Sequence, residues 1–315
     1  MKKIIVISLL ILVFAFVVYL SLFIGSVPFS PERKAMWLTI FWQIRLPRMV
    51  LAMLAGATLA LGGVIYQALL KNPLAEPYLL GVSSGAAFGA VLFVILGFAF
   101  IPAGAFLGAL GAFFLILTLA RLSGKISTFS LILSGVVMNA FFAALISMLI
   151  SFFPRRTFGI LFWLMGNLEV ADQKMLLVFL VLFLMITALL MFFHRKLDIL
   201  ALGDTEAYHL GIDVPRLKIL LFLLTTLLVA LAVSLTGVIG FVGLIVPHFA
   251  RMLVGAKHIK VIPMSLFLGA FFLMAGNVLI YSILKNPDLP IGVITALIGI
   301  PFLFYVFLRN KITSN

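Results

Sequence analysis

Residues 45–70 read RLPRMVLAMLAGATLALGGVIYQALL, in which two arginines around Pro47 are followed by a long run without any charge. A helix needs roughly 20 apolar residues to cross a lipid bilayer, and this run supplies them. The run is therefore predicted to be a membrane-spanning helix that Pro47 starts, with Arg45 and Arg48 at its edge. The two arginines are either membrane-edge anchors or contacts for another molecule, and the choice depends on which side they face.

The composition of the whole chain agrees with a membrane protein. Of its 315 residues, 65% are hydrophobic and only 10% are charged, whereas soluble domains carry about 25% charged residues. The net charge of +13 is attributed to basic loops on the inner side of a membrane rather than to nucleic-acid binding. Without cysteine, the chain can form neither a disulfide framework nor a thiolate metal site.

Charge-free runs give the number of spans. They cover 4–24, 49–70, 77–120, 126–154, 175–193, 219–250, 261–284 and 289–308. The first run has no cleavage site after it, so it is interpreted as a retained helix and not a signal peptide. The runs 77–120 and 219–250 are too long for one helix and break at 97–104 and near 236–243. The last piece of 219–250 is therefore short or continues towards Gly255. The chain is predicted to be all-α and polytopic, with ten transmembrane helices.

The distribution of basic residues predicts the orientation. An inner N-terminus places the larger share of the 22 lysine and arginine residues in inner segments, as the positive-inside rule requires. Both termini are then cytoplasmic, and RLPR lies on the outside. Positive charge is disfavoured there, which favours a specific role for Arg45 and Arg48 over simple anchoring.

Small residues recur through the spans, in AGATLALGG (55–63), GVSSGAAFGA (81–90) and GAFLGALGAFF (104–114). Small side chains four residues apart let helix backbones approach closely. Tight helix packing is the simpler interpretation, and thin walls around a substrate path are the second.

The residue types that are missing exclude several functions. All nine acidic residues lie in connections or at span ends, and only His248 falls inside an apolar run. A lone histidine there is interpreted as a structural hydrogen-bonding group and not as a proton relay, so no coupling ion site is evident. The pair Gly124-Lys125 lacks the glycine spacing of a P-loop, and no enzyme motif is present. If ATP drives this protein, another chain binds it.

The longest polar inner segment is RKLDILALGDTEAYHLGIDVPRLK, 195–218. Asp204 or Thr205 is predicted to cap a short amphipathic helix that ends at Gly211. The segment is either a solvated loop or a docking element whose apolar residues bury against a cytoplasmic partner. On the outer side, the segment 151–174 is predicted to hold a short helix. Its Arg155 and Arg156 either join a docking surface or contact lipid headgroups.

Several stretches, from the second span to the last, carry a resemblance to a known family. They are RLPRMVLAMLAGATLALGGVIYQALLKNPLAEPYLLGVSSGAAFGA, LILSGVVMNAFFAAL with FWLMGNL after it, LALGDTEAYHLGIDVPRLK, GVIGFVGLIVPHFARMLVG and DLPIGVITALIGIPFLFYVF. In these residues the chain resembles the permease subunits of ATP-binding-cassette (ABC) importers for cobalamin, ferric siderophores and haem. The resemblance implies a single type II importer permease domain over 1–315, in a bacterial or archaeal cell membrane.

The resemblance also implies the partners. They are a second copy of the chain, two cytoplasmic ATPase subunits that use ATP and Mg, and an extracytoplasmic substrate-binding protein. The chain itself is expected to bind no cofactor or metal and to contact membrane lipid but no nucleic acid. Substrate affinity would reside in the binding protein, and the path would run along the homodimer interface.

Site residues are carried over from the resemblance position by position. Arg45 and Arg48 match the arginines that contact the binding protein. The family's third basic residue falls near Tyr281, where Lys285 is a candidate substitute. The cytoplasmic gate matches Asn72 and Leu74, with a second element at Ser127, Thr128 and Phe129. The ATPase-coupling segment, about 197–216, carries Gly203, Glu206, Ala207, Leu210 and Gly211.

Three rival functions are less favoured. A secondary transporter needs an ion-coupling group and an intramembrane enzyme needs a catalytic constellation, and neither is evident in the sequence. A non-transporting scaffold would not need the gate and coupling motifs that the chain carries. Within the importer family the cargo is open. A ferric siderophore or haem is preferred on the breadth of the family alone, and cobalamin is the alternative.

Overall fold

Every regular element of the described chain is a helix. The computed structural model describes residues 2–24, 34–78, 80–122, 127–157, 160–169, 172–286 and 288–313. In chain order the helices are α1 (Lys2–Phe23), α2 (Lys34–Ile40), the π-helical η2 (Phe41–Arg45), α3 (Leu46–Leu70), α4 (Val82–Leu96), α5 (Ile101–Leu122), α6 (Thr128–Phe152), α7 (Pro154–Thr157), α8 (Ile160–Leu164), α9 (Gln173–Phe192), α10 (His194–Leu202), α11 (Asp204–His209), α12 (Val214–Thr236), α13 (Val242–Val254), α14 (His258–Val278), the π-helical η3 (Leu279–Leu284) and α15 (Ile291–Thr313). The all-α prediction is confirmed, while the Gly124-Lys125 pair lies outside the described residues.

The predicted spans correspond to helices. The break at 97–104 separates α4 from α5, and the break near 236–243 separates α12 from α13. As expected, α13 is short, and Gly255 follows its end with φ 84°. Six helices are long and apolar enough to cross a membrane, and Ser8–Phe23, Val82–Leu96, Val242–Val254 and Ile291–Phe304 are apolar but shorter. The prediction of ten spans depends on counting these four as crossings.

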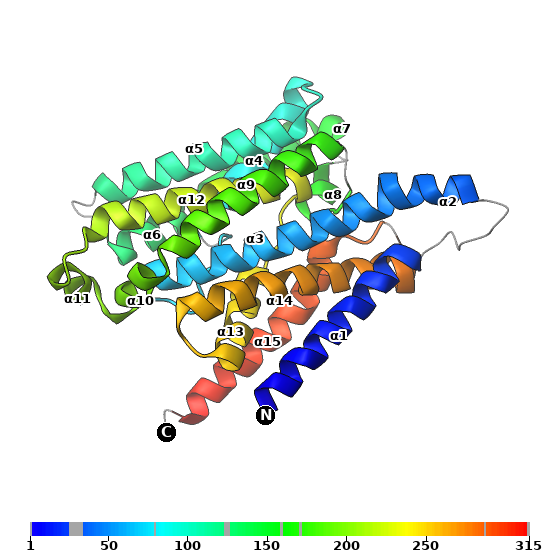
Figure 1. Cartoon of the computed structure of the whole chain (residues 1–315). Helices are drawn as coiled ribbons and strands as arrows, with labels where there is room; N and C mark the ends of the chain where they lie inside the picture. The colour runs from blue at the N-terminus through cyan, green and yellow to red at the C-terminus, as the bar shows by residue number, and fades with distance from the viewer. Residues whose placement is uncertain are drawn as a thin grey trace.

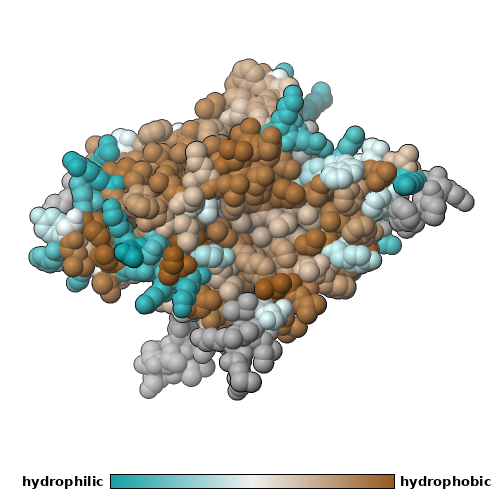
Figure 2. Space-filling view, in the orientation of Figure 1, coloured by the Kyte–Doolittle hydropathy of each residue, from teal (hydrophilic) through white to brown (hydrophobic). Residues whose placement is uncertain are grey.

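The long helices lie side by side, with α10 and α11 at one end of the bundle and α2, α7 and α8 at the other (Figure 1). The start of α1 and the end of α15 lie towards the end that carries α10 and α11, which agrees with two termini on one side. Hydrophobic residues cover the middle of the face shown in Figure 2, and hydrophilic residues gather towards its ends. This banding is the surface pattern of a protein surrounded by lipid.

The helix that carries RLPR begins earlier than the sequence predicts. Lys34–Leu70 is one continuous helix of 37 residues, because Ile40, Arg45 and Leu46 all have right-handed helical backbone angles. Pro47 has no N–H and its ring clashes with a preceding carbonyl, and the π-helical turn η2 directly before it accommodates the ring. The prediction that Pro47 starts a helix at the membrane edge is therefore wrong.

Glycines hold α3 against α13 and α14 by direct backbone contact. A Cβ atom on Gly56 would overlap the carbonyl of Gly269 in α14, and one on Gly63 would overlap the carbonyl of Gly243 in α13. The same arrangement joins α4 to α5, where Gly85 and Gly89 face Gly108 and Gly104. The small residues at spacing four thus act in helix packing, as the simpler interpretation predicted.

The non-helical segment that follows α8 hydrogen-bonds to the end of α12 and to the start of α15. Asn167 N donates to Thr236 O at 2.7 Å, and Ile291 N donates to Gly166 O at 3.2 Å. Backbone that is not helical survives inside a membrane protein only where protein groups satisfy it. These bonds therefore explain why α12 can stop at Thr236 and the chain resume as α13.

The glycine contact between α4 and α5 gives a test within a single helix. We expect Gly108→Ala to lower the free energy of unfolding of the detergent-solubilised protein by about 1–3 kcal/mol, because its methyl group would overlap the Gly85 carbonyl. Gly111→Ala in the same helix is the control, since nothing lies within 4 Å of its added methyl group. Equal unfolding midpoints for the two variants would contradict the contact.

Candidate functional site

The candidate site residues lie at the two ends of α3. Arg45 and Arg48 flank its first residues, and Lys71 directly follows its last. At ~1.5 Å per residue, its 25 residues separate the two groups by roughly 37 Å. We call the end with Arg45 the outer end and the end with Lys71 the inner end, following the predicted orientation.

Arg45 is already bound within the chain. Its Nη1 donates to the carbonyl of Leu22 at 2.9 Å, and its side chain is half-buried. Leu22 belongs to the last turn of α1, whose carbonyls have no partner in their own helix and attract positive charge. Arg45 therefore caps α1, and its part in docking stays a prediction.

Arg48 lies on an aromatic ring. Its Cζ is 3.9 Å from the centroid of the Tyr281 ring, a cation–π contact. Tyr281, the position where the family's third basic residue is expected, thus holds one of the other two arginines. Lys285 is exposed one turn later, in a left-handed conformation at the end of η3. Its part in docking stays a prediction.

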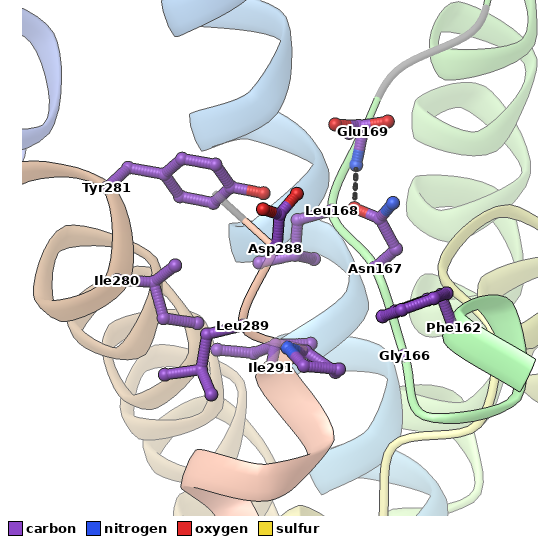
Figure 3. A pocket seen from close by; sticks show the side chains of 11 residues that line it. Phe162, Gly166, Asn167, Leu168, Glu169, Ile280, Tyr281, Asp288, Leu289 and Ile291 are labelled. Atoms are coloured by element: carbon purple, nitrogen blue, oxygen red, sulfur yellow. Dashed lines mark hydrogen bonds between the residues drawn. The ribbon is translucent and has the colours of Figure 1, made fainter. Parts of the chain in front are cut away.

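A cavity of about 190 Å³ opens beside Tyr281. Phe162, Asn167, Glu169 and Asp288 line it with Tyr281, and in Figure 3 the Asp288 carboxylate lies near the tyrosine hydroxyl while Glu169 lies above Asn167. The outer end therefore carries both signs of charge around Tyr281, with Arg48 on its ring and Glu169 and Asp288 in the lining of the adjacent cavity.

The first predicted gate residues form a tight turn at the inner end. Asn72 Oδ1 accepts a hydrogen bond from Leu74 N at 2.9 Å, which folds the chain back directly after α3. Leu74 is 46% exposed, so an apolar side chain stands at the tip of this turn. An exposed apolar side chain on a tight turn suits an element that contacts another molecule.

The second predicted gate element begins α6. Ser127 caps the helix, because its Oγ accepts from Ser130 N at 3.0 Å and its own N–H donates to Ser130 Oγ at 2.9 Å. Thr128 follows as the first helical residue, and Phe129 is 74% exposed. Ser127 thus has a structural role in the capping box, and Phe129 is the member of the three that presents an apolar surface.

The predicted coupling segment consists of two short helices, α10 and α11, separated at Gly203. In α11, Ala207 is fully buried, while Glu206 and Leu210 face outward with Leu210 63% exposed. Gly211 ends the helix in the left-handed region with φ 79°, as predicted. The last residues of the predicted segment, from Val214, already belong to α12.

Asp204 does not cap α11, contrary to the sequence-based expectation. Gly203 precedes the helix, and the Asp204 carboxylate instead lies between two lysines, with Oδ1 2.9 Å from Lys71 Nζ and Oδ2 2.6 Å from Lys218 Nζ. Partial burial raises the pKa of Asp204, but the hydrogen bonds and charges of Lys218 and Lys71 outweigh it, so the pKa is lowered. The carboxylate is therefore charged at neutral pH and joins α11 to α3 and α12.

Glu76 is a buried carboxylate that the sequence analysis did not single out. Its side chain is 7% exposed, and Oε2 accepts a hydrogen bond from Phe241 N at 3.0 Å, at the start of α13. Burial in the connection between α3 and α4 raises the pKa of Glu76 to about 7, against the effect of the Phe241 hydrogen bond. The only sequence signal for its burial was its position between Ala75 and Pro77, which are both small or apolar.

Further polar contacts tie the inner ends of the helices together. Asp198 Oδ1 of α10 accepts from His258 N at 2.9 Å and lies 2.6 Å from His258 Nδ1. Gln67 of α3 donates to Gly243 O at 3.1 Å and accepts from Arg251, both in α13. These contacts join α10, α3, α13 and α14 close to the coupling segment.

The structure shows the surroundings of His248 and of Arg156, whose roles the sequence left open. The His248 ring packs edge-on against Phe302 at 5.5 Å, which agrees with a structural role. In the outer segment, α7 and α8 are the predicted short helix, and Arg156 Nη1 donates to Ile95 O at the end of α4 at 2.6 Å. Arg156 thus caps a helix, while the exposed Arg155 stays undecided.

Known proteins resemble the chain over most of its length. The FecCD transport family matches residues 10–309. The hemin transport permease HmuU of Yersinia pestis is 38% identical, over 90% of this chain and 86% of that protein. The cobalamin import permease BtuC of Halobacterium salinarum is 40% identical, over 86% of this chain and 74% of that protein. The molybdate import permease MolB of Haemophilus influenzae is 37% identical, over 83% of this chain and 79% of that protein.

A solved structure shows the same fold. It is an inward-facing conformation of a metal-chelate type ABC transporter, with 34% sequence identity and a TM-score of 0.88. The match covers 97% of this chain and 99% of that chain. Helix arrangement and sequence therefore point to the same class of protein.

The raised pKa of Glu76 predicts a pH effect on stability. Because the folded pKa of about 7 exceeds the ordinary 4.5, the folded state binds a proton that the unfolded chain releases between these values. Relative to Glu76→Gln, which does not titrate, the native protein should be most stable below about pH 4.5 and lose stability as the pH rises to 7.

Thermal unfolding midpoints of the two detergent-solubilised proteins, measured across this range, check the effect. A difference between them that does not change with pH would contradict the assignment.

Proposed function

The chain belongs to the FecCD transport family, and we propose that this ABC importer permease of the metal-chelate type carries a ferric siderophore or haem into the cytoplasm. ATP hydrolysis belongs to a separate chain, as in its relatives. Cobalamin is the alternative cargo. The proposal describes alternating access, in which the cargo arrives at the outer end and leaves at the inner end.

One geometric observation carries this proposal. The candidate docking arginines and the candidate coupling segment are joined by a single buried helix, α3, with Arg45 and Arg48 at one end and the Lys71–Asp204 ion pair at the other. A permease must connect an external partner to an internal one. A helix packed against its neighbours through backbone contact provides a stiff connection between the two.

At the outer end, the proposed partner is an extracytoplasmic substrate-binding protein. Charge-assisted pairs between carboxylates of that protein and Arg45, Arg48 and Lys285 would set its register and speed its association. The half-buried positions of Arg45 and Arg48 support this role, because their intrachain contacts hold the guanidinium groups in defined places.

At the inner end, the proposed partners are two ATPase subunits that bind ATP and Mg. The exposed side chains of Leu202, Tyr208 and Leu210 around α11 give them an apolar contact surface. Movement of α11 would shift the gate elements at Asn72–Leu74 and Ser127–Phe129. In this proposal the chain itself binds no cofactor or metal.

The protein is a multi-pass membrane protein, and we place it in a bacterial or archaeal cell membrane as a homodimer. Two copies would enclose the translocation path along their interface. Small and weakly polar side chains along such a path suit a large cargo, because they bind it weakly and release it.

The cargo assignment can be tested in one reconstituted system. We expect liposomes containing the chain, its ATPase and its binding protein to take up a ferric siderophore or haem in the presence of ATP, in preference to cobalamin and molybdate. Uptake measured with each labelled cargo, with an inactive ATPase as control, checks this. Exclusive uptake of cobalamin or molybdate would overturn the assignment, since relatives named for both are about equally similar.

The docking role is best tested at Arg48, because replacing Arg45 would also remove the cap on α1. We expect Arg48→Glu to lower binding-protein-stimulated ATPase activity about tenfold, and a glutamate-to-arginine exchange on the binding protein to restore it. Lys174→Glu is the matched control, an equal charge change at an exposed outer residue whose only assigned contact is made by its backbone N–H. If the Arg48 variant retains full stimulation, Arg48 does not dock the binding protein.

A further inference from the structure

The connection that follows α3 is held at its first residue by the coupling segment. Lys71 Nζ lies 2.9 Å from Asp204 Oδ1, and Asp204 is the first residue of α11. The second oxygen of the same carboxylate is bound by Lys218, whose side chain is only 2% exposed. The buried Lys218 therefore holds Asp204 in place, and Asp204 in turn holds Lys71.

The middle of this connection is stiff. Asn72 accepts two hydrogen bonds within it, from Leu74 N to Oδ1 at 2.9 Å and from Ala75 N to the backbone carbonyl at 3.1 Å. Pro73 and Pro77 each fix one backbone angle. A segment with these restraints moves as a unit, so a displacement of its first residue reaches its last.

The far end is held by the broken helix pair α12 and α13. Glu76 Oε2 accepts from Phe241 N at 3.0 Å, where Phe241 has the uncommon φ of 69° for a residue with a side chain. Pro77 lies against the glycine positions 62 and 243, where α3 and α13 have no side chains. The carboxylate also faces the N-terminus of α13, whose dipole favours it.

The contact at Phe241 extends to another helix. The Phe241 ring occupies the space where Gly299 of α15 has no side chain. A shift of Phe241 would therefore move the start of α13 and press on α15. Both helices follow non-helical connections, at 237–241 and 288–290, which can change backbone angles more easily than a helix can.

We propose that residues 71–77 form a rigid strap that carries movement of α11 to the start of α13, with Lys71 and Glu76 as the positioning residues at its two ends. This inference rests on the proposed function, because it takes α11 as the contact for the ATPase. It adds a path by which that contact reaches the membrane interior. One ion pair and one hydrogen bond form the path, and each can be removed separately.

Lys71→Gln tests the first end. Asp204 keeps Lys218 as a partner in this variant, so no buried charge is left unpaired and the fold is preserved. In proteoliposomes with the ATPase and binding protein, we expect the ATP hydrolysed per cargo molecule to rise about fivefold, the factor that corresponds to a partly exposed ion pair. Lys71→Arg should restore the native ratio. Lys260→Gln, at an exposed inner lysine, is the control for lost charge.

Glu76→Ala tests the second end, and we expect the same ratio to rise about tenfold because Phe241 N–H loses a buried acceptor. Glu76→Gln keeps an acceptor oxygen and should stay near the native ratio. If one strap joins both ends, the double variant Lys71→Gln with Glu76→Ala is no more uncoupled than Glu76→Ala alone. Native ratios in Lys71→Gln, or effects that multiply in the double variant, would overturn the strap.

A third variant separates this inference from the proposed function. Leu210→Asp places a charge on the exposed apolar surface of α11 and should prevent ATPase assembly or uncouple hydrolysis from uptake. Normal transport in Leu210→Asp would refute α11 as the ATPase contact. Loss of coupling in Leu210→Asp together with native coupling in Lys71→Gln would refute the strap alone.

Discussion

Backbone contact between α3 and its neighbours is the constraint on which the rest of this structure depends. At Gly56 and Gly63 the helix touches backbone atoms of α14 and α13 directly, and any side chain there would separate the helices. Lipid tails are as apolar as leucine, so the hydrophobic effect cannot drive such contacts within a bilayer. Close packing and buried hydrogen bonds, such as Tyr66 to Thr226 at 3.0 Å, must provide the stability instead.

This packing gives the functional residues their positions. Because α3 is buried over most of its length, the groups at its two ends cannot move independently of the bundle. The irregular backbone is confined to a few places, including the break between α12 and α13 and the connection after α3. One of these places, the connection after α3, also holds the buried carboxylate of Glu76. The bundle is therefore rigid along α3 and in the strap that follows it, and the break between α12 and α13 is where its backbone can adjust.

Much of the helical framework could be predicted, because long apolar runs and glycine or proline breaks are local properties of the chain. The break at 236–243, the short α13 and the stop at Gly211 were found this way. Pro47 and Asp204 were assigned wrongly for a common reason. Each residue type has a strong local preference for a helix start, but here α2 continues into α3, and two lysines bind the Asp204 carboxylate.

The sequence by itself determined that the chain is a helical membrane protein, where most of its long helices lie, and which family pattern it carries. Only the tertiary structure decided that Arg45 caps α1, that Arg48 lies on Tyr281 and that Glu76 meets Phe241. The partners in these contacts are 23 residues apart for Arg45 and Leu22 and 165 residues apart for Glu76 and Phe241. Local patterns specify helices because helical hydrogen bonds join residues four apart, whereas the partner of a buried polar side chain is chosen by whichever helix packs against it.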